Sequence, residues 1–173
     1  MAFDYKKEYK EFYMPKNRPE IVTVPSMNYL AVRGKGDPNT PDGVVGIDYG
    51  NKSTFQWIFV IRLPDFITEA DFAWAVQTAD EKKKLDCSAA EFLTVEEGLC
   101  VQMLHVGSFD SEPASVALMD AYIQEQGYEN DFGKGRLHHE IYLSDARKTA
   151  LEKLKTVIRH PIRKAAADVG NKR

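Results

Sequence analysis

One short run near the end of the chain carries most of the fold prediction, and it reads His138-His139-Glu140-Ile141-Tyr142-Leu143. Side chains along a β-strand point alternately to opposite faces. Positions 139, 141 and 143 then form one face, which is largely apolar and suits a core. Positions 138, 140 and 142 form the other face, which places a carboxylate between an imidazole and a phenol.

The surroundings of that second face decide what Glu140 does. If the face lines a cavity, Glu140 is a candidate general acid or base, or a counter-ion for a cationic ligand. If the face meets open water, Glu140 is an ordinary surface residue, since strand faces are often solvated. The run alone leaves both interpretations open.

Composition and charge exclude several classes of function. A chain of 173 residues with 43% hydrophobic and 28% charged residues is typical of one globular domain, or of two small halves sharing a core. A net charge of −3 without a basic stripe or a reading helix argues against nucleic-acid binding. No apolar stretch is long enough to span a bilayer, and the N-terminus lacks the apolar core of a signal peptide.

The cysteines and histidines give no sign of a metal site. Cys87 and Cys100 lack metal-ligand spacing, and both are expected to be reduced thiols. The histidines lack the spacing of a zinc site. We therefore predict a cytoplasmic protein with no metal, no cofactor and no membrane partner.

Hydrophobic periodicity predicts alternating strands and helices. Strands are expected over residues 21–33, with an interruption at Pro25, and over 55–62, 92–106, 138–143 and 154–162. The strand over 55–62 is apolar on both faces and suits the centre of a sheet. A helix is expected from the N-cap Thr68 to about Lys84, and a second from Pro113 to a C-terminal cap at Gly127.

The predicted domain covers residues 21–163. An N-terminal arm over residues 1–20, extended or briefly helical, precedes it, and a C-terminal tail over residues 164–173 follows it. Within the domain the second half reads strand, helix, strand, strand, and the first half begins in the same way. Only about twenty residues separate Gly34 from Phe55, too few for a helix, a turn and a full strand. The sequence leaves open whether the first unit lost a piece near residues 42–47 or whether the sequence omits one.

Five stretches, taken in order, resemble the GyrI-like small-molecule-binding family, which also supplies the ligand domain of drug-sensing bacterial regulators. They are Pro25–Pro38, Trp57–Arg62, Glu97–Gly107, His138–Asp145 and Lys153–Arg159. The resemblance covers most of residues 20–163. Two departures are a residue, Ala146, where relatives usually carry proline, and the short segment after Asp42, where relatives carry a helix and a strand with groove residues.

This resemblance implies an α+β fold of tandem duplicated β-α-β-β units with a ligand groove between the halves, which agrees with the internal repeat. It also implies that Glu140 lies in the groove with Tyr142 near it, and that the protein is of the stand-alone type. Stand-alone relatives include enzymes that open the cyclopropane ring of DNA-alkylating natural products with water. Others bind compounds only, and one branch inhibits DNA gyrase.

The candidate site follows from these residues. Glu140 is the predicted base, with its pKa raised by burial and aromatic walls, and Tyr142 is the predicted donor or water-positioning group. Trp57 can stack on a flat aromatic ligand, although plain core packing is an equal alternative. His138, Phe59 and Tyr29 are further substrate-binding candidates, and Tyr29 shares its strand face with Arg33.

Four other polar residues are expected to have no role in the chemistry. His105 alternates with apolar residues and is expected to be a satisfied core histidine. His139 is expected to point with the core set. Glu97 and Glu112 fall in or near predicted loops, and solvated surface is the expected environment for both.

Three functions remain open at this point. The first is a hydrolase that detoxifies cyclopropane-bearing genotoxins, with a hydrophobic aromatic small molecule as its substrate. The second is a passive binder of hydrophobic or cationic drugs, in which Glu140 is only a counter-ion. The third is a gyrase-interacting module. The first two are favoured because the candidate residues lie on a strand face and not on an exposed patch.

Overall fold

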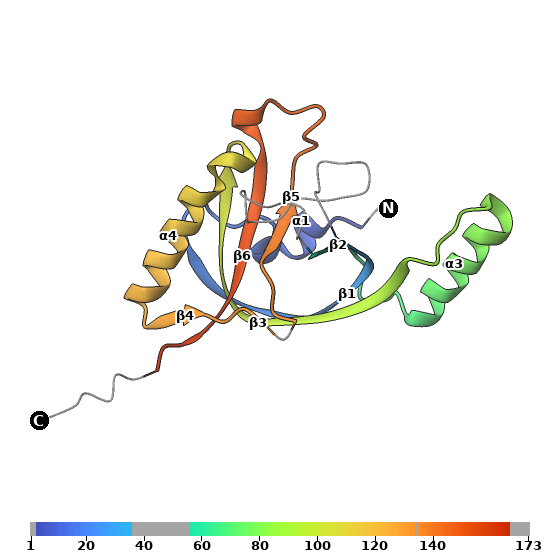
Figure 1. Ribbon diagram of the computed structural model, residues 1–173, viewed down its shortest axis with the longest axis horizontal. Coiled ribbons are helices and arrows are strands. Elements are labelled where there is room, and N and C mark those ends of the chain that lie inside the picture. The colour runs from blue at the N-terminus through green and yellow to red at the C-terminus, as the bar shows by residue number, and fades with distance from the viewer. Residues whose placement is uncertain (1–2, 36–55, 134, 167–173) are drawn as a thin grey trace, which may run out of the picture. The chain divides into compact units, whose positions relative to one another are not determined.

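The structure, a computed structural model, describes residues 3–35, 56–133 and 135–166. It divides into two compact units, residues 1–25 with 96–173 (unit 1) and residues 26–95 (unit 2). Helices and strands are mixed, as the α+β prediction requires (Figure 1). The strands are β1 (Glu20–Lys35), β2 (Gln56–Arg62), β3 (Ala90–Val106), β4 (Tyr128–Asn130), β5 (His139–Tyr142) and β6 (Lys155–Lys164).

Hydrogen bonding orders the strands β2-β1-β3-β6-β4, and β5 pairs with β6 off this path. The prediction of a central strand over residues 55–62 is wrong for the described residues, because β2 lies at the end of this order. Its apolar side chains Phe59 and Ile61 are 47% and 67% exposed. The predicted interruption at Pro25 is also wrong, because β1 continues through it as one strand.

Unit 2 contains an antiparallel strand pair and one helix. Strand β1 pairs with β2 so that Gly34 lies opposite Trp57. Helix α3 (Glu69–Lys83) begins as predicted, with a capping box in which Thr68 and Asp71 bond reciprocally. It ends at Lys84 in the left-handed conformation, with φ of 54°.

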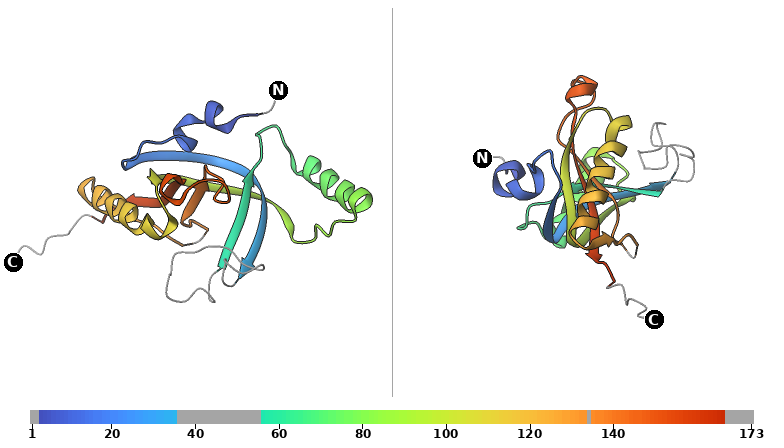
Figure 2. Two further views of the ribbon diagram at one scale, coloured as in Figure 1. Left: turned by 90° about the horizontal axis from the view of Figure 1, so that it is seen from above. Right: turned by 90° about the vertical axis from the view of Figure 1, so that its left-hand side faces the viewer.

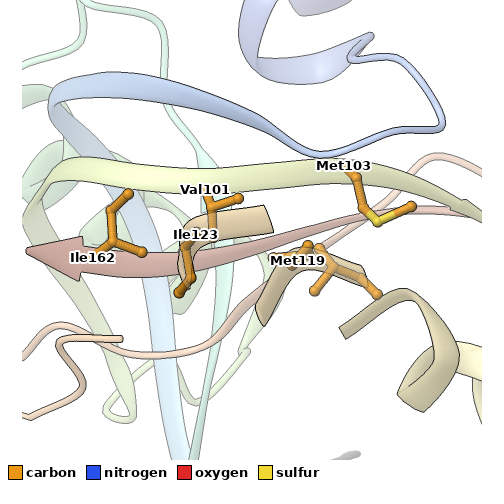
Figure 3. Packing of buried hydrophobic residues seen from close by; sticks show 6 residues of the cluster. Val101, Met103, Met119, Ile123 and Ile162 are labelled. Atoms are coloured by element: carbon orange, nitrogen blue, oxygen red, sulfur yellow. The ribbon is translucent and has the colours of Figure 1, made fainter. Parts of the chain in front are cut away.

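Unit 1 is built on the antiparallel pairs β3–β6 and β5–β6. Helix α4 (Glu112–Glu125) packs against one face of these strands and ends as predicted, with Gly127 at φ of +74° just beyond it. An apolar stripe of this helix and the facing side chains of β3 and β6 form the core. Figure 3 shows the cluster, whose buried members are Val101, Met103, Met119, Ile123, Ile158 and Ile162.

The N-terminal residues lie on the other face of the same strands. Two short helices, α1 (Tyr5–Glu8) and α2 (Lys10–Tyr13), lie opposite α4 across β3 and β6 (Figure 2). Phe12 and Tyr13 are buried, and the backbone N–H of Leu104 donates to the carbonyl of Lys16 at 2.8 Å. Strands β3 and β6 are therefore covered by helices on both faces within unit 1.

Unit 1 reads strand, helix, strand, strand, strand, because the short strand β4, which the sequence did not predict, follows α4. The tandem duplication stays a prediction, and the segment near residues 42–47 on which it depends lies outside the described residues. None of the helices in the described ranges is long and apolar enough to cross a membrane.

Candidate functional site

Strand β5 presents Glu140 and Tyr142 to the side of the sheet that α4 covers. Glu140 lies opposite Ile158 and Tyr142 lies opposite Thr156 on β6. Directly opposed residues of an antiparallel pair point to the same face. Ile158 belongs to the core beneath α4, so Glu140 and Tyr142 share that face. The alternation predicted for residues 138–143 therefore puts the carboxylate and the phenol on one face, as expected, but this face carries the hydrophobic cluster that was expected on the other.

Both carboxylate oxygens of Glu140 accept hydrogen bonds. His138 Nε2 donates to Oε1 at 2.8 Å, and the Tyr142 hydroxyl donates to Oε2 at 2.6 Å. The Glu140 side chain is only 9% exposed. Burial pushes its pKa up, but the bonds from His138 and Tyr142 and the nearby imidazoles outweigh this and hold the pKa below its usual range. The predicted rise in pKa is therefore wrong, and Glu140 is a buried carboxylate at neutral pH.

A second imidazole supports His138 from below. His138 Nδ1 lies 2.7 Å from His160 Nε2, and His160 is buried. Burial, with the adjacent His138, lowers the pKa of His160 to about 3, so this ring is neutral at neutral pH. His138 thus uses both ring nitrogens, because its Nε2 faces the Glu140 carboxylate and its Nδ1 faces His160 Nε2. The remaining His160 Nδ1 is buried without a partner in the described structure.

Aromatic rings border this chain of imidazoles and carboxylate. Phe132 meets the His160 ring edge to face at 4.9 Å between centroids. Phe109 meets the Tyr142 ring in the same way at 5.5 Å. Tyr142 itself is 45% exposed. The site therefore joins a buried carboxylate to solvent through a phenol, with apolar ring surface on either side.

Glu112, expected on the solvated surface, is buried, so that prediction is wrong. It is the first residue of α4 and belongs to the buried stripe of this helix with Ser115, Met119 and Ile123. Burial, together with the nearby Glu140 carboxylate, raises the pKa of Glu112 to about 8. Glu112 is thus a neutral acid at neutral pH, beside an ionised one.

The expectation that Glu97 is solvated is also wrong. Glu97 is buried on the opposite face of the sheet, where its Oε2 accepts from Arg159 Nη1 at 2.8 Å and its Oε1 lies 3.0 Å from His139 Nδ1. Burial alone would raise the pKa of Glu97, but His139 and Arg159 overcome it and lower the pKa to about 2. His139 does point to the face predicted for it, but there it contacts a carboxylate.

The Glu97–Arg159 pair ties the N-terminal helices to the strands. Arg159 is 1% exposed, and it also donates to Gln102 Oε1 and to the Phe12 carbonyl at 2.9 Å each. Gln102 in turn donates to the Glu11 carbonyl at 2.6 Å. His139 directly precedes Glu140 in β5. This network therefore holds β5 in place from the face of the sheet opposite to Glu140.

His105 is a satisfied core histidine, as predicted. Its Nε2 lies 3.0 Å from the Ser108 carbonyl and must donate to it, so Nδ1 accepts from the Ser115 hydroxyl at 2.9 Å. Both ring nitrogens are thereby used. This pair joins β3 to α4, on the same helix face as Glu112.

Three predicted ligand-binding residues belong to unit 2. The rings of Trp57 and Phe59 meet edge to face at 4.9 Å between centroids, and Phe59 is half-exposed. Tyr29 is 4% exposed and its hydroxyl contacts Met27 Sδ at 3.5 Å, whereas Arg33 pairs with Glu91. A ligand-binding role for Trp57, Phe59 and Tyr29 stays a prediction.

Within the described ranges, no group of three histidine, cysteine or acidic side chains is placed to hold a metal ion. Cys87 and Cys100 are free thiols. Burial, with the nearby Glu97, raises the pKa of Cys100 to about 12, which makes it unreactive.

The sequence prediction missed His160 and Glu112 for identifiable reasons. His160 lies on β6, two positions beyond Ile158, so the same alternation that placed Glu140 could have placed it. Glu112 lies seven residues before Met119, and helical periodicity puts both on one face. Glu112 was expected on the surface because it lies next to a predicted loop, although it continues the buried stripe of α4.

Comparison with known proteins shows which protein family the chain resembles. The profile of the GyrI-like small molecule binding domain matches residues 64–163. A crystal structure of a hydrolase from Listeria innocua is 37% identical, with a TM-score of 0.83, over 94% of this chain and 100% of that chain. An uncharacterized conserved protein from the same organism is 36% identical with a TM-score of 0.84, again over 94% and 100%.

A more distant likeness concerns the fold alone. The C-terminal domain of EcmrR is 13% identical with a TM-score of 0.58, over 86% of this chain and 98% of that domain. No curated protein matches the chain significantly. The profile match and the 37% identity show that the chain belongs to the GyrI-like small-molecule-binding domain family.

Proposed function

We propose that this protein binds a flat, hydrophobic small molecule at Glu140 and adds water to an activated cyclopropane ring in it, which detoxifies a DNA-alkylating compound. The observation that carries the proposal is the ionised Glu140, buried and held at both oxygens by His138 and Tyr142. The hydrolase from Listeria innocua that aligns over its whole length supports hydrolytic chemistry in this fold.

The chemistry needs a base near the attacked carbon. In the proposed reaction Glu140 takes a proton from water as the water oxygen bonds to a cyclopropane carbon. The carbon–carbon bond of the ring breaks, and its electron pair moves through the conjugated system to a carbonyl oxygen. His138 and Tyr142 act by holding Glu140 in one orientation, and Tyr142 also offers a hydroxyl at the exposed edge of the site. Trp57, Phe59 and Tyr29 are proposed to contact the aromatic body of the substrate.

Mass spectrometry of a cyclopropane-bearing DNA alkylator tests the proposal. The wild type is expected to convert it to a product heavier by one water, and Glu140→Gln to leave it unchanged while still binding it. Glu152→Gln, an exposed carboxylate elsewhere in unit 1, is the matched control and should keep full activity. Unchanged compound with the wild type would rule out hydrolysis of this substrate class.

Passive binding is the second candidate, and the same carboxylate favours it. An ionised carboxylate beside aromatic rings attracts hydrophobic cations. In that case Glu140→Gln weakens binding of a cationic dye such as rhodamine 6G but leaves an uncharged aromatic compound of similar size unaffected. Equal loss for both compounds would argue that Glu140 shapes the site and is not a counter-ion.

A further inference from the structure

Glu112 is the one buried carboxyl of the site for which the proposed reaction has no use so far. It is 4% exposed, and its Oε1 has no hydrogen-bond partner among the described residues. Buried polar groups in folded proteins are almost always paired, so an unpaired one calls for an explanation. Leaving it unpaired costs free energy that the fold must offset elsewhere.

The geometry places Glu112 over the row of residues that carries the site. Tyr142, Thr156 and His105 lie side by side across β5, β6 and β3, because Thr156 is opposite Tyr142 on one side and His105 on the other. Ser115 bonds to His105 at the end of this row. Glu112, three residues before Ser115, lies on the same helix face, and its position between the helix and the row brings it near Glu140.

The Thr156 hydroxyl, like Glu112 Oε1, is buried without a hydrogen-bond partner in the described structure. The Thr156 hydroxyl lies close enough to favour the ionised form of Glu112 slightly, but the two do not form a good hydrogen bond, since Thr156 Oγ1 and Glu112 Oε1 are both buried without a partner in the described structure. Two unpaired polar groups thus lie together beside a carboxylate that is fully paired. A ligand oxygen is the kind of acceptor that would complete this arrangement.

We propose that Glu112 is the proton donor of this site, and that it hydrogen-bonds and then protonates the carbonyl oxygen of a bound cyclohexadienone-type substrate. This deepens the proposed hydrolysis and rests on it for the transfer step, but not for the hydrogen bond. Glu140 and Glu112 then work as a pair, one taking a proton and the other giving one.

The step balances in protons and electrons. Water bonds to the cyclopropane carbon and gives its proton to Glu140. The broken carbon–carbon bond sends its electron pair to the carbonyl oxygen, which takes the Glu112 proton and becomes a phenol. The enzyme is left with Glu140 protonated and Glu112 ionised, and one proton transfer from Glu140 to Glu112 restores the starting state. No other reactant is required.

The protonation states of Glu112 and Glu140 suit these roles. The pKa of Glu112 is raised to about 8 by burial and by Glu140, whereas the pKa of Glu140 is held below its usual range. Environments that separate two carboxyl pKa values in this way assign the acid and the base. Four other titratable groups lie on this face of the sheet, namely Tyr142, His138, His105 and His160. Asp110 lies in the turn before α4. His105 is fully bonded, and His160 is neutral.

Three measurements on the intact protein test the proposal, with Glu112→Gln as the main variant. Gln is isosteric with the neutral acid and keeps a hydrogen-bond donor, but it cannot transfer a proton. Turnover of a spirocyclopropyl cyclohexadienone is expected to fall by about 10²–10⁴-fold in kcat with little change in KM. The wild-type rate should decline as the pH rises through about 8, and this decline should be absent from the residual rate of the variant. Glu125→Gln, at the exposed end of the same helix, should behave as wild type.

The second measurement needs no turnover. Calorimetry with an unreactive aromatic ketone should show wild-type affinity falling above pH 8, where Glu112 loses its donor proton, and a flat profile in Glu112→Gln. Binding with this profile in a protein that hydrolyses nothing would support the donor role and overturn the hydrolase alone.

The third measurement needs no ligand. Carbon-13 NMR of the glutamate carboxyls in the free protein should give Glu112 a midpoint near 8 that moves down in Glu140→Gln. A midpoint in the ordinary glutamate range, or full turnover by Glu112→Gln with an unchanged pH profile, would overturn the proposal.

Discussion

His160 Nε2 lies 2.7 Å from His138 Nδ1, so a neutral, buried imidazole supports the ring that holds Glu140. Glu140 and His160 come from the neighbouring strands β5 and β6, and His138 directly precedes β5. The carboxylate is the end of a chain of hydrogen bonds that starts at the buried His160. This arrangement orients His138 and makes its Nε2 the donor to Glu140. The acid stability of unit 1 and the basicity of Glu140 are both expected to depend on it.

The buried His160 predicts loss of stability in acid. The pKa of His160 is about 3 in the folded protein and 6.5 when unperturbed. Between pH 3 and 6.5 this residue is therefore protonated in the unfolded chain and neutral in the folded chain. Stability is therefore full above about pH 6.5 and falls as the pH drops, with a slope from this group of about 1.4 kcal/mol per pH unit. Urea unfolding at intervals between pH 4 and 7 should show a shallower slope in His160→Gln. An unchanged slope would place the acid sensitivity elsewhere.

Tyr142→Phe tests the second hydrogen bond to Glu140. The phenol donates to Oε2 at 2.6 Å and stabilises the charged form, so its removal should raise the pKa of Glu140. Because Tyr142 is 45% exposed, water can replace part of the lost hydrogen bond, so the rise should be smaller than for a fully buried donor. Carboxyl NMR titration measures it, with Tyr128→Phe as a control away from the site. The ring contact with Phe109 should survive, so the fold should be unchanged.

The Glu97–Arg159 pair predicts a strong and non-additive loss of stability. Both side chains are buried, and removing one leaves the other as a buried charge without its partner at 2.8 Å. Arg159→Met or Glu97→Gln should each reduce the free energy of unfolding by about 3–5 kcal/mol. The double variant should lose less than the sum, because neither charge is then left alone. Additive losses in a denaturant double-mutant cycle would contradict the coupling.

Gly34→Ala should disturb Trp57 within unit 2. A Cβ at Gly34 would overlap the Trp57 indole, which lies across the glycine of the neighbouring strand. The ring must move outward, which should reduce stability by about 1–3 kcal/mol and shift the Trp57 emission to longer wavelength. The chain has two tryptophans, so Trp74→Phe leaves Trp57 as the only emitter. An unchanged spectrum in Gly34→Ala, Trp74→Phe would show that the ring does not cover the glycine.

The failed predictions share a physical cause. Glu97 and Glu112 were expected in water because charged residues beside loops usually lie there. Whether a carboxyl is buried depends on which distant groups meet it, and Arg159 and His139 come to Glu97 from β6 and β5. The rise expected for the pKa of Glu140 failed for the same reason, because bonds from His138 and Tyr142 outweigh burial.

The sequence by itself determined most of the described helices and strands, and the faces of β5 and α4. Alternation put Glu140 and Tyr142 on one face of β5, periodicity gave the buried stripe of α4, and local chemistry set the capping box of α3 and the cap at Gly127. These features depend on neighbours within a few positions along the chain. Only the tertiary structure decided that His160 supports His138, that Glu112 is a neutral acid and Glu140 a carboxylate. Protonation states depend on burial and on groups brought together from different elements, and no local pattern encodes those distances.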